Sequence, residues 1–162
     1  MAMHDASSLN RTAWSATLHC LTGCAIGEVL GMVIGTWLGW GNAATIVLSI
    51  VLAFFFGYVM TMQPLLGSGL PFRRAVGLAL ASDTASITTM EIVDNLIMLV
   101  VPGAMNAGLD SIIFWVSLLI SLVLAGLAAF PVNRWLIARG QGHAVVHAYH
   151  GHGAGHGDHH TS

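Results

Sequence analysis

The sequence contains no lysine and very little charge of either sign. Among its 162 residues there are five arginines and seven aspartates or glutamates, and 56% of the residues are hydrophobic. Only 7% are charged, whereas a soluble globular protein carries roughly 25%. The scarcity of basic residues excludes the basic surface of a nucleic-acid-binding protein, and the low total charge excludes a disordered, solvated chain. Two cysteines are too few for a disulfide framework. The composition predicts one small domain in a lipid bilayer.

Long apolar segments indicate how the chain crosses that bilayer. A spanning helix needs about 20 mostly apolar residues. Backbone polar groups in hydrocarbon must be hydrogen-bonded within the segment, which favours helices. The expected fold is therefore an all-α integral membrane bundle of four transmembrane helices, at residues 18–40, 43–66, 75–101 and 111–137.

The third of these segments differs from the others in its polarity. Residues 82–95 read SDTASITTMEIVDN, with nine polar residues in fourteen. The apolar pieces on either side are too short to cross alone, so we expect one helix that stops at Pro102. A broken or re-entrant segment is the alternative, and it would place the two ends of the chain on opposite sides of the membrane.

The arginines predict the orientation. Short loops rich in basic residues remain cytoplasmic. With four spans, all five arginines fall on one side, and the opposite loops contain none. We therefore expect a cytoplasmic segment at 1–17, a cytoplasmic tail at 140–162 and a multi-pass protein of the cell (inner) membrane. The arginines are Arg11, Arg73, Arg74, Arg134 and Arg139.

Glycine recurs at every fourth position of the first span. Such a row lets two helix backbones approach closely, because dispersion and weak hydrogen bonds replace the absent hydrophobic drive in lipid. The partner expected within the chain is the small-residue row of the third span, at Gly77, Ala81, Ala85 and Thr89. A second copy of the chain is the alternative partner. A repeat that arose by chance in a glycine-rich protein is the remaining explanation. The row is Gly23, Gly27, Gly31, Gly35 and Gly39.

A second row lies one residue further along the same helix. Residues four apart share a helix face, so two thiols and a carboxylate line up beside the glycines. Thiolate, thioether and imidazole are ligands of soft metals such as Cu(I), and zinc is also compatible. Alternatively, the cysteines are small buried hydrophobic residues. The row is Cys20, Cys24, Glu28, Met32 and Thr36, and His19 precedes it.

Two methionines of the second span, Met60 and Met62, are expected at about the depth of Cys20 and Cys24. The second span runs back toward the side of the termini, which is why these residues reach that level. They would add thioether ligands. The alternative is that they are ordinary core or lipid-facing methionines.

Acidic residues inside the third span carry the functional signal. On a helical wheel Asp83, Met90 and Asp94 lie within about 40° of one another, and Glu91 is close to them. Three ionised carboxylates facing lipid would cost roughly 8 to 10 kcal/mol. They must face the interior, bind cations or hold protons. We expect Glu28 of the first span between the levels of Asp83 and Glu91, so that four carboxyl groups converge.

A polar core without any ligand is the alternative explanation of this segment. Its hydroxyl and amide groups would hydrogen-bond the carboxyl groups and each other. They are Ser82, Thr84, Ser86, Thr88, Thr89 and Asn95.

Two motifs of the chain resemble a known family. They are His19-Cys20-x-x-Gly23-Cys24-x-x-Gly27-Glu28 and Asp83-x-x-Ser86-x-x-x-Met90-Glu91-x-x-Asp94-Asn95. Over residues 18–139 the sequence is similar to small bacterial and archaeal four-helix membrane proteins that are catalogued only as a domain of unknown function. The resemblance implies the architecture and brings no activity with it.

The C-terminal segment is rich in histidine spaced by glycine and alanine. Seven imidazoles can capture Ni, Zn or Cu(II) ions reversibly. A disordered extension that improves solubility is the alternative. The histidines are His143, His147, His150, His152, His156, His159 and His160.

Together these features predict a membrane protein that binds a metal ion and moves or delivers it, with copper favoured and zinc next. No organic cofactor is implied. The expected partners are the lipid bilayer, further copies of the chain in a homo-oligomer, and a metallochaperone or metalloenzyme. The proposed metal ligands are His19, Cys20, Cys24, Glu28, Met60, Met62, Asp83, Met90, Glu91 and Asp94.

Other functions remain open. A metal-independent, proton-coupled carrier or channel for a small solute would use the carboxyl groups alone, and a structural or assembly subunit would use none of them. Haem held by two histidines is excluded, because His19 is the only imidazole in the spans. An enzyme is not expected, since the sequence has no phosphate loop, nucleophile elbow or zincin motif.

Overall fold

The computed structural model describes residues 2–67, 69–103 and 107–139, with side chains from Ser7 onward. It confirms the all-α fold with four helices, and the described part of the chain contains no strand. The helices are α1 (Ala2–Trp37), α2 (Asn42–Gly67), α3 (Phe72–Val100) and α4 (Ile112–Ala138). The histidine-rich tail lies outside the described residues.

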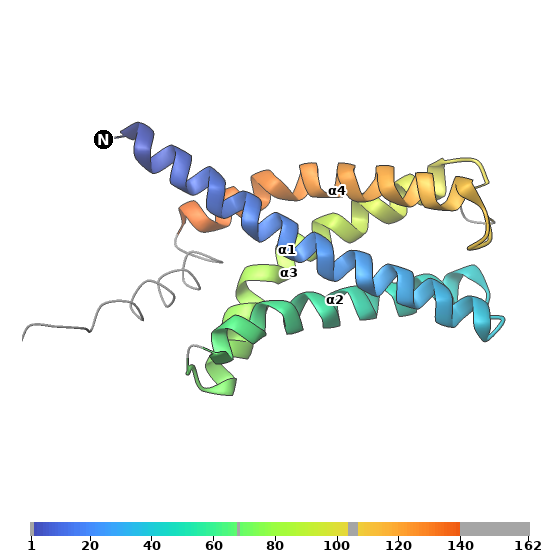
Figure 1. Cartoon of the computed structure of the whole chain (residues 1–162), viewed down its shortest axis with the longest axis horizontal. Coiled ribbons are helices and arrows are strands. Elements are labelled where there is room, and N and C mark those ends of the chain that lie inside the picture. Colours follow the sequence, from blue (N-terminus) through green and yellow to red (C-terminus); the bar gives the residue numbers. More distant parts are fainter. Residues whose placement is uncertain (1, 68, 104–106, 140–162) are drawn as a thin grey trace, which may run out of the picture.

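Helix α1 lies between α2 and α4, and successive helices run in opposite directions (Figure 1). It packs most extensively on α2, while α3 contacts α4 and α2 more than it contacts α1. The start of α1 and the end of α4 lie together, and we call this the terminal end of the bundle. The α1–α2 and α3–α4 connections lie at the opposite end, which we call the loop end.

The first helix begins much earlier than the sequence predicts. The expected boundary was Leu18, with a separate segment before it, but α1 is continuous from Ala2. Its early turns are held by α4, because Ala13 and Ala16 pack against Ile137. The buried Asn133 amide also donates a hydrogen bond of 2.9 Å to the Thr17 hydroxyl. These contacts between distant parts of the sequence extend the helix.

The glycine row of α1 packs against α2, so the prediction that α3 is its partner is wrong. A Cβ added to Gly23 would lie 2.7 Å from Gly57 Cα, and one added to Gly27 would collide with the Ala53 backbone. Gly31 and Gly35 meet Ser49 and Thr45 in the same way. The row on α2 is small and is also spaced by four residues, which makes this close contact with α1 sterically feasible.

Gly39 of the glycine row and the small-residue row of α3 lie outside this contact. Gly39 is beyond the end of α1, where it adopts the left-handed φ of 68° that closes the turn. On α3, Gly77, Ala81 and Ala85 are exposed and Thr89 is half-buried. This row of α3 therefore lies on the outer face of the bundle, with Thr89 at its edge.

Three helices are long and apolar enough to cross a membrane, at Ser7–Trp37, Asn42–Gly67 and Ile112–Ala138. Helix α3 is the exception because its interior face carries Asp83, Glu91 and Asp94. It is nevertheless one unbroken helix of 29 residues, about 43 Å long, and not the broken segment considered as an alternative.

Substituting Gly27 by alanine tests the α1–α2 contact. The added methyl group would overlap the Ala53 backbone, so we expect Gly27→Ala to lower the free energy of unfolding by about 1 to 3 kcal/mol or more. Gly77→Ala is the matched control, because its Cβ meets open space and alanine has the higher helix propensity. Thermal unfolding in detergent measures both. If Gly27→Ala unfolds at or above the wild-type temperature, the close contact is wrong.

Candidate functional site

Helices α1 and α3 present their polar and sulfur-containing side chains to each other in the bundle interior. Each of these side chains is at most 5% exposed. They form three successive levels from the terminal end to the loop end, which we call the thiol–carboxyl level, the sulfur pair and the acidic level. The residues are Cys20, Cys24 and Glu28 on α1, and Asp83, Met90, Glu91 and Asp94 on α3.

The thiol–carboxyl level consists of Cys20 and Asp83. The Cys20 Sγ atom lies 3.9 Å from Asp83 Oδ1, and the Ser82 hydroxyl donates to the same oxygen at 2.8 Å. His19, half-buried on α1, and Thr61 of α2 also interact with the Asp83 carboxyl group. Three helices therefore contribute to this level, and it combines hard oxygen with soft sulfur.

The sulfur pair consists of Cys24 and Met90. The two sulfur atoms are 4.0 Å apart, and the thiol donates toward the thioether. Both side chains belong to a dry cluster that contains Ala53, Ile87 and Ala125. Cys20 lies one helical turn from Cys24 on the same face of α1, and both cysteines are free thiols.

The acidic level consists of Glu28, Glu91 and Asp94. Asp94 accepts a hydrogen bond from Ser121 of α4, and Glu91 accepts one of 3.4 Å from the Asn95 amide. The charged groups that act on Glu28 are the carboxyl groups of Asp94 and Glu91, and no arginine is among them.

One oxygen of Glu28 (Oε2) and one of Glu91 (Oε1) have no hydrogen-bond partner. Leaving a buried polar group unpaired costs about 1 to 3 kcal/mol, and more when the group is charged. The acidic level is therefore incompletely satisfied by the described residues of the protein.

The four carboxyl groups do not form the single cluster that the sequence predicts. Asp83 lies with Cys20, whereas Glu28 interacts with Glu91 and Asp94. The expected position of Glu28, between the levels of Asp83 and Glu91, is also wrong. Glu28 interacts with Glu91 and with Asp94, which follows Glu91 on α3. The register of α1 against α3 is set by the contacts of α1 with α2 and α4, and not by a common starting level of the spans.

The structure does not bring every predicted ligand to the site. Met60 and Met62 are half-buried, and none of the described contacts joins them to Cys20 or Cys24. The residue that α2 contributes is Thr61, which lies between them in the sequence and is 1% exposed. Helix α4 contributes Ser121, which the sequence analysis also missed.

A signal for both missed residues is present in the sequence. Helices α2 and α4 each carry a buried row of small or polar residues spaced by four, like the rows of α1. Reading all four helices for this repeat would have placed Thr61 and Ser121 inside. The rows are Thr45, Ser49, Ala53, Gly57 and Thr61 on α2, and Ser117, Ser121, Ala125, Ala129 and Asn133 on α4.

The capacity of these levels to hold a metal depends on sulfur. In the part of the chain that the structure describes, no group of three His, Cys, Asp or Glu side chains is placed to hold a metal ion. The two sulfur atoms of the sulfur pair nevertheless lie 4.0 Å apart, which is close enough for both to contact one ion through metal–sulfur bonds of about 2.3 Å. A site here would therefore use the Met90 thioether together with thiols.

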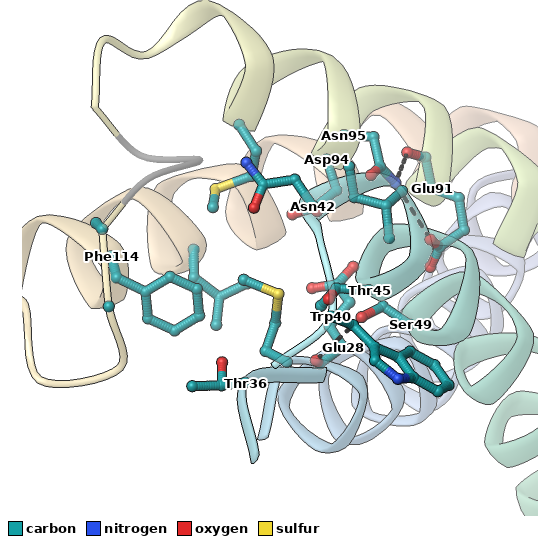
Figure 2. A pocket seen from close by; sticks show the side chains of 16 residues that line it. Glu28, Thr36, Trp40, Asn42, Thr45, Ser49, Glu91, Asp94, Asn95 and Phe114 are labelled. Atoms are coloured by element: carbon teal, nitrogen blue, oxygen red, sulfur yellow. Dashed lines mark hydrogen bonds between the residues drawn. The ribbon is translucent and has the colours of Figure 1, made fainter. Parts of the chain in front are cut away.

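A pocket of about 270 Å³ lies on the loop-end side of the acidic level (Figure 2). Glu28, Glu91 and Asp94 form part of its lining, together with Trp40 of the α1–α2 connection and Asn42 at the start of α2. The sequence analysis did not predict this pocket, because it is enclosed by residues of all four helices.

Comparison with known proteins gives one match. Residues 9–142 match the model of a family described as "Domain of unknown function (DUF4396)". No curated protein and no solved structure matches the chain. The family match spans all four helices and includes every residue of the three levels.

Burial of the two cysteines predicts their reactivity. Both are fully buried, so we expect neither to react with a maleimide in the folded protein and both to react after unfolding. Gly41→Cys is the positive control, because Gly41 is exposed in the α1–α2 connection and its Cβ meets open space. Mass spectrometry of the labelled protein gives the count. Rapid labelling of the native wild-type protein would contradict the buried sulfur pair.

Proposed function

The chain belongs to the family described as a domain of unknown function (DUF4396), and we propose that it is a four-span membrane protein that binds a soft metal ion between α1 and α3 and moves or delivers it. Copper is favoured, and zinc is next. The observation that carries the proposal is the buried Cys24–Met90 sulfur pair, which lies between two levels of carboxyl groups.

The chemistry of the sulfur pair supports copper over zinc. Thiolate and thioether together select Cu(I), whereas zinc sites are built from cysteine, histidine and carboxylate. Because no three side chains of the latter kinds are grouped in the described residues, the thioether of Met90 becomes the distinguishing ligand. Cys20, one turn away, is the third sulfur ligand that the proposal assigns.

Metal binding by cysteine also moves a proton. A thiol must lose its proton to become a ligand, so binding releases one proton per cysteine. The Asp83 oxygen 3.9 Å from Cys20 Sγ is an acceptor for that proton. Exchange of a metal ion for protons at this level would let the metal site and the carboxyl groups act together.

The antiparallel bundle and its charges support four spans with both termini in the cytoplasm. All five arginines belong to the terminal end, which by the positive-inside rule is the cytoplasmic one. Trp115 and Trp135 of α4 are both exposed and lie twenty positions apart, which corresponds to about 30 Å of helix, the thickness of the hydrocarbon core. Tryptophan prefers the two membrane interfaces, so this spacing supports a full crossing of the cell (inner) membrane.

This orientation places His19, the thiol–carboxyl level and the tail on one side of the membrane. The tail histidines would capture the ion there, and a metallochaperone or metalloenzyme would exchange it with the tail. The exposed small residues of α3 offer a face on which a second copy can approach closely, and we expect a homo-oligomer. No catalytic role and no organic cofactor are proposed.

The pocket at the loop end favours one second candidate. A metal-independent, proton-coupled carrier for a small solute would bind its substrate there and use the carboxyl groups for protons. Transport by such a carrier would be unaffected by chelators, by removal of the tail and by loss of the thiols.

The proposed topology predicts which sites an impermeant thiol reagent reaches. In intact cells we expect Gly41→Cys at the loop end to react from outside. Phe72→Cys, at the exposed start of α3, should react only after the membrane is permeabilised. Labelling followed by gel-shift analysis measures both. Reaction of both positions from the same side would refute the four-span arrangement.

Removal of the thiols tests metal binding. We expect dialysed wild-type protein in detergent to retain about one copper ion per chain, and the combined variant Cys20→Ser with Cys24→Ser to retain almost none. The control variant is Met60→Leu with Met62→Leu, because those sulfur atoms lie outside the described contacts of the cysteines. Elemental analysis gives the occupancy.

A truncation after Arg139 separates the tail from the interior. The truncated protein should keep the tightly held ion and lose only the exchangeable ones. If the double cysteine variant of this truncated chain binds as much copper as its parent, the sulfur site does not exist.

A further inference from the structure

We propose that the pocket at the loop end binds a small organic ammonium cation. The proposal goes beyond metal binding at the sulfur pair and would stand if that binding failed, because the pocket lies on the loop-end side of Met90 and contains neither cysteine. Three properties of its lining carry the inference. They are unpaired carboxyl oxygens, room for a molecule larger than a bare ion, and apolar walls beside the charge.

The unpaired oxygens indicate the sign of the charge that the ligand carries. Glu28 Oε2 and Glu91 Oε1 belong to side chains that are nine-tenths or more buried, both line the pocket, and neither oxygen has a hydrogen-bond partner. The charged groups that act on these two residues are carboxyl groups alone. An ionised carboxyl group is stable in the interior only when it is paired, so the group that would complete this site in its ionised form is a cation that donates hydrogen bonds.

The acidic level is only partly occupied by the protein's own donors. Ser121 donates to Asp94, and Asn95 donates to Glu91. The remaining acceptor positions lie on two different helices, Glu28 on α1 and Glu91 on α3. An ammonium group carries up to three N–H donors that can reach acceptors in separate directions. It can therefore bridge Glu28 and Glu91 without the regular coordination that a metal requires.

The size of the pocket distinguishes a molecule from an ion. At about 30 Å³ for each water, 270 Å³ corresponds to about nine water molecules. This is far more than a bare metal ion fills, and His, Cys, Asp and Glu form no metal-holding group of three in the described residues around it. An ammonium group with a short alkyl or aromatic substituent matches this volume.

The apolar part of the pocket lining can contact the alkyl or aromatic substituent of the cation. Met32, Met98, Phe114 and Leu118 line the pocket together with the carboxyl groups. Figure 2 shows Phe114 and Trp40 on opposite sides of the lining, with Glu28 between them in that view. Trp40 is 47% exposed, and a cation over its indole face gains cation–π energy. An organic cation satisfies the carboxyl groups and the walls simultaneously, whereas a hydrated metal ion would leave the walls without a partner.

Beyond the acidic level toward the terminal end lies the dry cluster around the sulfur pair, which includes Ile87 and Ala53. Ile87 lies against Gly57 of α2 there, so the packing is tight. The ligand therefore reaches the carboxyl groups from the loop end, past Trp40 and Asn42.

Calorimetric titration of the full chain in detergent tests the proposal. The probe is 2-phenylethylammonium, and 2-phenylethanol is the uncharged control of nearly the same shape. We expect the cation to bind and the alcohol to bind at least about tenfold more weakly, because only the cation pairs with the carboxyl groups. Equal binding of the alcohol would mean an apolar pocket without a charge requirement and would overturn the proposal.

Variants localise the binding. Glu28→Gln and Glu91→Gln keep the side-chain shape and should each weaken binding of the cation about tenfold or more. Asp110→Asn is the matched control, because it removes an exposed carboxylate at the same end of the bundle outside the pocket lining. Trp40→Phe should weaken binding less than either glutamine variant. Unchanged affinity in both glutamine variants would refute the site.

One further variant separates this proposal from metal binding. Cys20→Ser with Cys24→Ser should retain binding of 2-phenylethylammonium, since neither thiol lines the pocket and a serine hydroxyl at position 24 keeps the hydrogen bond that the Cys24 thiol makes with Glu91. Heat upon addition of Cu(I) or Zn(II) to this thiol-free variant, without any heat from the amine, would show that the acidic level binds metal instead and would overturn the proposal. Binding of the amine by the thiol-free variant supports it regardless of what the sulfur pair does.

Discussion

In the proposed four-span arrangement the structure depends on one constraint, which is that the carboxyl groups of α3 cannot face hydrocarbon. An ionised carboxylate at the centre of a bilayer costs about 2.5 to 3.5 kcal/mol even on the most lenient scale. Asp83, Glu91 and Asp94 must therefore point into the bundle, and this fixes the rotation of α3 about its own axis. Apart from Phe72, Arg73 and Arg74 at its start, the exposed face of α3 is then left to aliphatic residues, small residues and threonines.

The interior can accept these groups because two different faces of α1 contact α2 and α3. Its glycine row is pressed against the α2 backbone, and this contact turns the adjacent row, with Cys20, Cys24 and Glu28, toward α3. Two rows one residue apart point in directions that differ by about 100° on a helix, so a single helix can serve both contacts. The sulfur pair beside this contact is at most 1% exposed.

The sequence was sufficient to predict the four helices, the inward orientation of the acidic face and the two rows on α1. Each of these follows from composition or from periodicity within one helix. The partner of the glycine row was not predictable in this way, because α2 and α3 both carry small residues at the required spacing. The same limit applies to Met60, Thr61 and Met62 of α2. These neighbouring residues point in different directions around the helix axis, and contacts with other helices decide which of them faces the interior.

The offset between Glu28 and Asp83 and the pocket at the loop end depend on still more distant contacts. The difference in depth between Glu28 and Asp83 depends on the axial position of α1 against α4, where the Asn133 amide donates to the Thr17 hydroxyl. The pocket exists because the four helices leave space between Phe114 and Trp40 at the loop end, and no local pattern in the chain encodes that space. Periodicity therefore predicts which face is buried, while the depth of each residue and the shape of the voids require the assembled bundle.

The unequal satisfaction of the buried polar groups points to where a ligand acts. Asn133 and Thr17 pair with each other near the terminal end, and Ser121 pairs with Asp94 near the middle. Glu28 and Glu91 differ from these because each keeps an unpaired oxygen next to a void. A half-satisfied buried network is less stable than an apolar one of the same volume, so stability alone does not explain two glutamates at these positions. The proposed binding of a cation would explain them, because the ligand would supply the donors that the fold omits.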